Sequence, residues 1–195
     1  MLSEQTAFYI EVVSAICNLI YIILLMKEKI ACWAFGIVGS LLGVFVMINA
    51  KLYSESILYA FYALIGIYGW YVWSTQGNEK HFLITRWSIK NIGFAIAIGA
   101  VLSFLLGYFF YKNTDAEMPF LDASTTTFAF IASYMQAHKI LSNWIFWIII
   151  NGVSVGLYFN RSLDFYGVVG IVFLIAAILG FREWNKRYQL QGLQT

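Results

Sequence analysis

Charged residues are scarce in this chain of 195 residues, since Asp, Glu, Lys and Arg together make up only 11%. A soluble globular domain has about 25%, so this composition cannot cover a surface that faces water. Hydrophobic residues make up 61%, and the mean hydropathy is +0.75. The shortage of charge therefore excludes a soluble protein and indicates an integral membrane protein.

Proline and cysteine are also rare. With a single proline and no series of short alternating strands, helices are favoured over a barrel, the other structure that satisfies its backbone hydrogen bonds in lipid. Cys17 and Cys32 lie in or beside apolar segments and are too few for a disulfide framework. No metal-ligand spacing is present, and we expect neither a metal nor another cofactor.

Long apolar segments are what the chain has instead. A helix needs roughly 20 apolar residues to span a bilayer. Seven segments reach or approach this length, at about residues 6–26, 32–50, 55–74, 91–111, 121–137, 144–160 and 164–182. We therefore expect an all-α polytopic membrane protein with seven transmembrane helices.

Residues 33–73 repeat as residues 144–184, at a constant offset of 111 positions. The matched pairs are Trp33 and Trp144, Asn49 and Asn160, Leu52 and Leu163, Ile67 and Ile178, Gly69 and Gly180, and Trp73 and Trp184. The same offset places Glu11 on Asp122. We predict a single transmembrane domain built of two three-helix repeats, at about 6–74 and 121–184, joined by a connector helix at about 91–111.

Three helices per repeat is an odd number, so one extra helix is needed for both copies to enter the membrane from the same side. The predicted layout is a 3+1+3 parallel repeat, as in SWEET proteins. The connector helix carries few polar side chains and is expected to face lipid or a neighbouring subunit. Internal repeats with polar groups at membrane depth are typical of secondary transporters, and we predict that function.

Basic residues are distributed unevenly between the two sides of the predicted helices. The side with the C-terminus has nine, Lys27, Lys29, Lys80, Arg86, Lys90, Lys139, Arg182, Lys186 and Arg187, and the other has three, Lys51, Lys112 and Arg161. Cytoplasmic loops carry the excess of Lys and Arg. We expect a multi-pass protein of the cell inner membrane, with its N-terminus outside and its C-terminus in the cytoplasm.

Polar and aromatic residues share one face of several predicted helices, at helical spacings of 3, 4 and 7. Trp144, Trp147 and Asn151 form an aromatic wall that ends in a group able to donate and accept hydrogen bonds. In the first repeat, Gly36 and Ser40 occupy the positions of Trp147 and Asn151. A large face opposite a small one would leave a gap for a flat ligand, so we predict a substrate site here.

The other predicted substrate-binding residues lie on the remaining polar faces, and they are Tyr59, Tyr62, Glu55, Asn18, Asp122 and Gln136. An unpaired polar side chain is costly in hydrocarbon, so these faces should meet. The two tyrosines could close the side opposite the wall, with the glutamate ready to pair with a cationic ring or an exocyclic amine.

Simpler structural roles compete with ligand binding. Trp33, Trp73 and Trp184 lie near the ends of predicted spans, where anchoring at the membrane interface explains a tryptophan. A structural pair or an N-terminal helix cap explains Asp122 as well as a binding role does.

Several runs of residues carry a family resemblance. IYGWYVW at 67–73, HKILSNWIFWIIINGVSVGLYF at 138–159 and GFREW at 180–184 resemble the Pnu family of bacterial vitamin transporters. LYSESILYAFYALIGIYGW at 52–70 is similar to that family's third helix, and PFLDA at 119–123 to the start of its fifth. The W-x-x-W of Trp144 and Trp147 matches the family signature, and the resemblance spans nearly the whole chain.

The resemblance implies a homotrimer in the lipid bilayer whose protomers each move one substrate by facilitated diffusion. Family members import dephosphorylated precursors, namely nicotinamide riboside, thiamine or riboflavin, which cytoplasmic kinases then trap. It also implies substrate contacts by Trp144, Trp147 and Asn151. Tyr59 and Gly66 stand where the riboside branch has two amide side chains. Replacing two hydrogen-bonding amides with a phenol and a glycine favours thiamine over nicotinamide riboside as the substrate.

Other functions stay open or are disfavoured. A binding subunit that needs an energising partner is an alternative, as is a sugar uniporter of the same layout, which would need more Asn and Gln. An enzyme is not expected, because the two histidines lie near or outside the membrane boundary and neither cysteine has a basic neighbour. Proton coupling would need a titrating intramembrane acid, for which Glu11, Asp122 and Glu55 are candidates.

Overall fold

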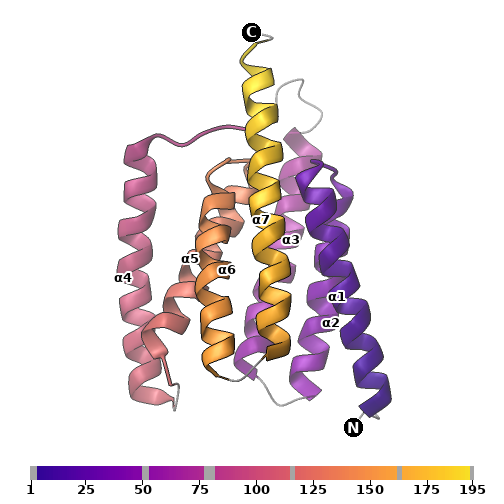
Figure 1. Cartoon of the computed structure of the whole chain (residues 1–195), viewed down its shortest axis with the longest axis vertical. Coiled ribbons are helices and arrows are strands. Elements are labelled where there is room, and N and C mark those ends of the chain that lie inside the picture. The colour runs from indigo at the N-terminus through magenta and orange to yellow at the C-terminus, as the bar shows by residue number, and fades with distance from the viewer. Residues whose placement is uncertain (1–3, 50–52, 77–81, 115–116, 162–163, 194–195) are drawn as a thin grey trace. The chain divides into compact units, whose positions relative to one another are not determined.

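The computed structural model describes residues 4–49, 53–76, 82–114, 117–161 and 164–193. They form seven helices, α1 (Glu4–Met26), α2 (Ala31–Asn49), α3 (Tyr53–Gln76), α4 (Ile89–Asn113), α5 (Pro119–Ala137), α6 (Asn143–Asn160) and α7 (Asp164–Gln191) (Figure 1). These residues contain no strand beyond one isolated bridge between Thr85 and Ile140. The predicted all-α class with seven helices is confirmed, and α7 continues nine residues past its predicted end.

Five helices, α1, α2, α3, α4 and α7, are long and apolar enough to cross a membrane by length and composition. The other two, α5 and α6, have 19 and 18 residues and are interrupted by polar side chains. In hydrocarbon such side chains need partners within the protein. Polar contacts between helices are therefore expected where α5 and α6 meet.

The chain forms two compact units, residues 1–82 and 83–195, called unit 1 and unit 2 below. In unit 1, α2 packs against both α1 and α3. In unit 2, α4 packs against α5, α5 against α6, and α6 against α7. The middle helix of each predicted triplet thus contacts both of its sequence neighbours.

Two tryptophans cross inside each unit. Trp33 and Trp73 meet edge to face with ring centroids 5.5 Å apart at 87°. Trp144 and Trp184 do the same at 5.4 Å and 88°. No member is more than 4% exposed. The prediction that Trp33, Trp73 and Trp184 are interfacial anchors was wrong, because each ring is buried against a second indole.

A glycine lies under one ring of each pair. A Cβ at Gly69 would overlap the ring of Trp33, and a Cβ at Gly180 would overlap the ring of Trp144. Neither of these two indole N–H groups has an acceptor among the described residues. Close packing, and not hydrogen bonding, therefore holds both rings.

The turn after the first helix of each triplet also has one geometry. Glu28 and Lys139, 111 positions apart, are the described non-glycine residues with positive φ, at 55° and 51°. The amide of the next residue, Lys29 or Ile140, donates to the carbonyl five residues back at 2.9 Å in both turns. This is the Schellman type of helix end. It starts α2 and α6 in the same way.

A stripe of small residues joins α4 to α5. The buried residues of α4 lie four apart and are Ala95, Gly99, Ser103 and Gly107. The ring of Phe128 covers Gly99, and the ring of Phe120 covers Gly107. Small residues at this spacing let membrane helices approach closely. The predicted connector helix is thus a packed member of unit 2.

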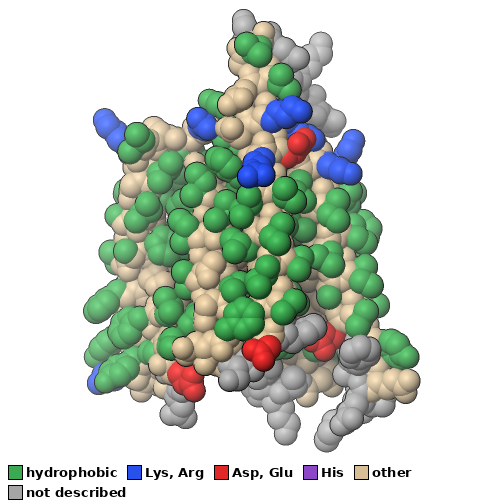
Figure 2. Space-filling view, in the orientation of Figure 1, with side chains coloured by type: hydrophobic (Ala, Val, Ile, Leu, Met, Phe, Trp, Pro, Cys, Tyr) green, Lys and Arg blue, Asp and Glu red, His purple; other side chains and the backbone are tan. Residues whose placement is uncertain are grey.

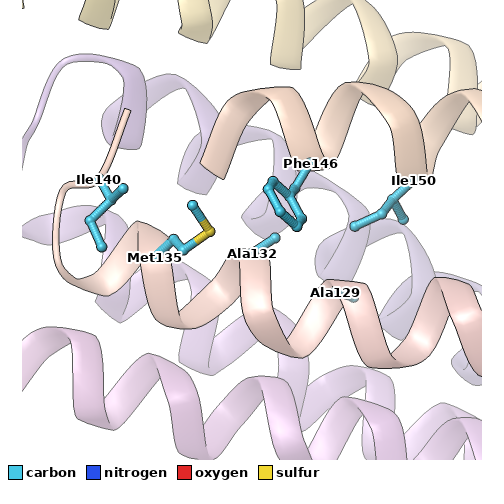
Figure 3. Packing of buried hydrophobic residues seen from close by; sticks show 6 residues of the cluster. All are labelled: Ala129, Ala132, Met135, Ile140, Phe146 and Ile150. Atoms are coloured by element: carbon cyan, nitrogen blue, oxygen red, sulfur yellow. The ribbon is translucent and has the colours of Figure 1, made fainter. Parts of the chain in front are cut away.

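The interface between α5 and α6 contains a buried hydrophobic cluster (Figure 3). Its members are Ala129, Ala132, Met135, Ile140, Phe146 and Ile150. Ala129 and Ala132 of α5 have small side chains. The Phe146 and Ile150 side chains of α6 can therefore lie close to the α5 backbone. This cluster supports the polar residues described below.

The outward faces of α4 and α7 are covered by hydrophobic side chains (Figure 2). Val101, Phe104 and Ile175 are 60%, 62% and 52% exposed. Within unit 2, Lys and Arg gather mainly at the end where α4 begins and α7 finishes, and acidic residues at the opposite end. An apolar band between two charged ends suits a bilayer.

Gly180→Ala is expected to lower the free energy of unfolding in detergent by about 1–3 kcal/mol, because the added methyl group overpacks the contact with Trp144. The matched control is Gly152→Ala on α6, where a Cβ would meet nothing within 4 Å. In a helix that change is neutral or stabilising by up to about 1 kcal/mol. Thermal denaturation of both variants checks this, and equal melting temperatures would contradict the role given to Gly180.

Candidate functional site

Two predicted site residues meet between α5 and α6. The indole Nε1 of Trp147 donates a hydrogen bond to Oε1 of Gln136 at 2.9 Å. Gln136 is only 4% exposed, whereas Trp147 is half-buried and packs against the cluster of Figure 3. The buried amide thus fixes the orientation of an indole that keeps part of its ring free.

Asn151 lies one helical turn beyond Trp147 on α6 and is also half-buried. Within the described part of the chain its side chain makes no hydrogen bond. An amide with free donors and acceptors beside a partly exposed indole is a group that a ligand could use.

Trp144 differs from the other two members of the predicted wall. It is 0% exposed, and its ring lies between Trp184 and Gly180. Packing between α6 and α7 accounts for this residue, and its contact with a substrate stays a prediction.

Within unit 1, an aromatic ring covers the residue that corresponds to Trp147. The corresponding position there is Gly36, and a Cβ at Gly36 would lie 2.9 Å from Cδ2 of Tyr21 on α1. The position of Tyr21 in the second repeat is Ala132, which belongs to the cluster against which Trp147 packs. The bulky residue thus lies on the first helix of the triplet in unit 1 (Tyr21 on α1) and on the second helix in unit 2 (Trp147 on α6). Tyr21 therefore covers Gly36 within unit 1, and a gap between the two repeats stays a prediction.

Asp122 joins the first turn of α5 to the end of α6. Its Oδ2 accepts from Nη2 of Arg161 at 2.9 Å, and the two side chains are 30% and 23% exposed. This hydrogen bond, together with the charge of Asp122, raises the pKa of Arg161 above its usual value. Glu117, 75% exposed, approaches Nε of the same arginine at 3.8 Å. A structural pair was one of the roles expected for Asp122, and its partner is Arg161. Binding of substrate by Asp122 stays a prediction.

In unit 1, Tyr59 and Tyr62 lie edge to face on α3, with ring centroids 6.5 Å apart. The ring of Tyr59 also covers Gly43 of α2. Glu55 belongs to α3, but its side chain lies outside the described residues. Tyr59 thus contributes to packing between α2 and α3, and the closure of a site by the tyrosines stays a prediction.

Asn18 of α1 is half-buried against Gly39 of α2, where a Cβ would lie 2.9 Å from its Oδ1. Beside it, the Ser14 hydroxyl donates to the Gly39 carbonyl at 2.8 Å. Gly66 of α3 is similarly covered by Ile37. Because Asn18 and both tyrosines belong to unit 1, their approach to Trp147 also stays a prediction.

Sequence reasoning missed Arg161, which it counted only as a loop charge. Its partner lies 39 residues away, so no helical spacing links the two. The repeat offers a partial signal, since Glu11 occupies the position of Asp122 but Ala50 occupies that of Arg161. The described residues also contain no group of three or more His, Cys, Asp or Glu able to hold a metal.

These features define a polytopic helical membrane protein with partly buried polar contacts between α5 and α6. Its fold is similar to the crystal structure of the vitamin B3 transporter PnuC, with a TM-score of 0.76 and 18% identity, covering 93% of this chain and 82% of that one. Residues 8–186 match the family model described as nicotinamide mononucleotide transporter. The chain belongs to this family of vitamin transporters, and it is a transporter and not an enzyme. The resemblance to the Pnu family is thereby confirmed.

Two relatives show the range of the family. The chain is 26% identical over 210 residues to the nicotinamide riboside transporter PnuC of Escherichia coli, covering 94% of this chain and 88% of the relative. It is 23% identical over 193 residues to the riboflavin/roseoflavin transporter RibM of Streptomyces davaonensis, covering 96% and 89%.

A double-mutant cycle of Asp122→Asn and Arg161→Gln is expected to give a coupling energy of about 1–2 kcal/mol in unfolding, because these side chains share a direct, partly buried hydrogen bond. The control cycle replaces Asp122→Asn by Glu117→Gln. Its partner distance of 3.8 Å and 75% exposure predict coupling close to zero. Similar values in the two cycles would show that the Asp122 pair has no special structural role.

Proposed function

We propose that this chain imports nicotinamide riboside by facilitated diffusion. The observation that carries the proposal is the hydrogen bond between Trp147 and Gln136, with the free amide of Asn151 one turn away. The similarity to the riboside transporter of Escherichia coli over 94% of the chain supports the choice of substrate.

The chemistry of nicotinamide riboside suits these groups. Its pyridinium ring is a flat cation, which an indole face attracts through its π electrons. Its ribose hydroxyls and carboxamide both donate and accept hydrogen bonds, as the Asn151 side chain does. In a dry site these contacts are selective, because an analogue that lacks a partner leaves a buried polar group unpaired.

Thiamine, the substrate favoured by the sequence, becomes the alternative. That preference assumed that Tyr59 and Gly66 face the substrate. In unit 1 the Tyr59 ring covers Gly43, and Gly66 is covered by Ile37, so packing explains both residues. The aromatic pair of Tyr59 and Tyr62 is the observation that still favours thiamine, whose two rings offer more stacking surface.

For transport we propose a homotrimer in the cell inner membrane, with the N-terminus outside and the C-terminus in the cytoplasm. The distribution of Lys and Arg supports this orientation. Facilitated diffusion needs only two conformations of similar free energy, and phosphorylation of the imported vitamin would set the net direction. A binding subunit that depends on an energising partner is the competing possibility, and uptake into liposomes by the purified chain alone separates the two.

Calorimetric titration of the purified protein is expected to show binding of nicotinamide riboside and weaker binding of thiamine and riboflavin. Trp147→Ala should reduce affinity by about 5- to 150-fold, the usual loss when an aromatic stacking partner is removed. Trp70→Ala is the matched control, since Trp70 is 40% exposed and lies in unit 1. Tight binding of thiamine with no response to nicotinamide riboside would overturn the choice of substrate.

Gln136→Leu tests whether the buried amide positions the indole. We expect weaker binding of about tenfold, because a misplaced aromatic ring loses much of its contact, while the folded protein keeps its hydrophobic contacts. Trp147→Phe should show a similar loss, because it also removes the hydrogen bond. If Gln136→Leu binds like the wild type, the hydrogen bond has no part in recognition.

A further inference from the structure

Unit 2 contains an apolar groove between α4 and α5. It has a volume of about 460 Å³, and its lining includes Trp87, Asn91, Phe94, Ile98, Phe130 and Tyr134. The groove exists because the small-residue stripe of α4 ends at Ala95. From Gly99 to Gly107 the two helices touch, and toward the start of α4 they separate (Figure 1).

The lining changes from amphipathic to apolar along the groove. Trp87, Asn91 and Tyr134 lie at one end, and tryptophan and tyrosine are enriched where membrane meets water. Ile98 lies seven residues further along α4, about 10 Å deeper. One leaflet of hydrocarbon is roughly 15 Å thick. The groove therefore has the depth and polarity gradient of a site for the upper part of a lipid.

The polar end of the groove is positive. Lys90 is exposed beside Asn91, and the first turn of α4 contains no acidic residue. The Ser88 hydroxyl accepts from the Asn91 amide at 3.3 Å and caps the helix, whose N-terminus carries a partial positive charge. A phosphate would be attracted to this end, and a head group with net negative charge more strongly than a zwitterionic one.

We propose that this groove binds an anionic phospholipid, with one acyl chain between α4 and α5 and the phosphate near Lys90. A flexible chain can follow the narrow apolar floor at Ala95. A helix of a second copy is at least 10 Å wide and would be held away by the Phe94 ring, which is 68% exposed. The site is separate from the residues proposed to contact the vitamin.

Native mass spectrometry of the full-length protein tests the charge preference. Phosphatidylglycerol and phosphatidylethanolamine with the same acyl chains are offered at equal concentration. The wild type should retain the anionic lipid about fivefold better, as expected for one Lys near the membrane surface. Lys90→Gln should abolish this preference, whereas Lys112→Gln at the other end of α4 should keep it.

Two further variants test the apolar part. Ala95→Phe fills the floor, and Ile98→Trp narrows the rim from a side chain that is already 40% exposed, so it preserves the packed stripe. Both should weaken retention of either lipid by about tenfold, the loss of roughly two buried CH₂ groups. Ile96→Phe, on an exposed side of the same helix, should have no effect.

Three results would overturn the proposal. The first is equal retention of the two lipids by the wild type, and the second is identical behaviour of Lys90→Gln and Lys112→Gln. The third is that Ala95→Phe and Ile98→Trp both lose subunit association but retain lipid like the wild type. This result would mean that the groove binds a second copy of the chain.

Discussion

A tryptophan ring pressed onto a glycine of the next helix determines how the helices of each triplet approach. The same three residues recur 111 positions apart, with ring separations of 5.5 and 5.4 Å. In lipid the hydrophobic effect does not drive helices together, so packing and polar contacts must do so. Each indole contributes a large contact area in one orientation, and the glycine allows it to lie close to the neighbouring backbone.

Around this shared contact the two triplets differ in which helix carries the large side chain and which carries the small one. Tyr21 lies against Gly36 in unit 1, and Trp147 packs against the cluster that contains Ala132 in unit 2. Asn18 lies against Gly39 in unit 1, where the second repeat has Ala129 and Ile150. A packed interior tolerates substitutions that conserve total volume. Each triplet therefore keeps the same fold, while equivalent positions of the two triplets carry different side chains.

The proposed function relies on this difference between the triplets. In unit 2 the enlarged residue on α6 is an indole, and the buried amide of Gln136 orients it at 2.9 Å. At the other end of the same helix pair, Arg161 and Asp122 form an ion pair for which the first repeat has no matching arginine. Two polar contacts thus join α5 to α6, as lipid favours, and the Asn151 side chain makes no hydrogen bond within the described residues.

Hydropathy and helical periodicity are local properties, so they predict the seven helices and the repeat, with helix limits correct to within a few residues except at the end of α7. It also singled out Trp147, Gln136 and Asn151, since polar residues in an apolar helix are few. Which side chains meet became known only from the fold. Trp184 looks like an interfacial anchor in sequence and is 0% exposed in the fold, and Asp122 gained a partner 39 residues away. The physical reason is that burial and pairing depend on contacts between helices, and these are set by the volume of every residue at the interface and not by the position of one residue along its own helix.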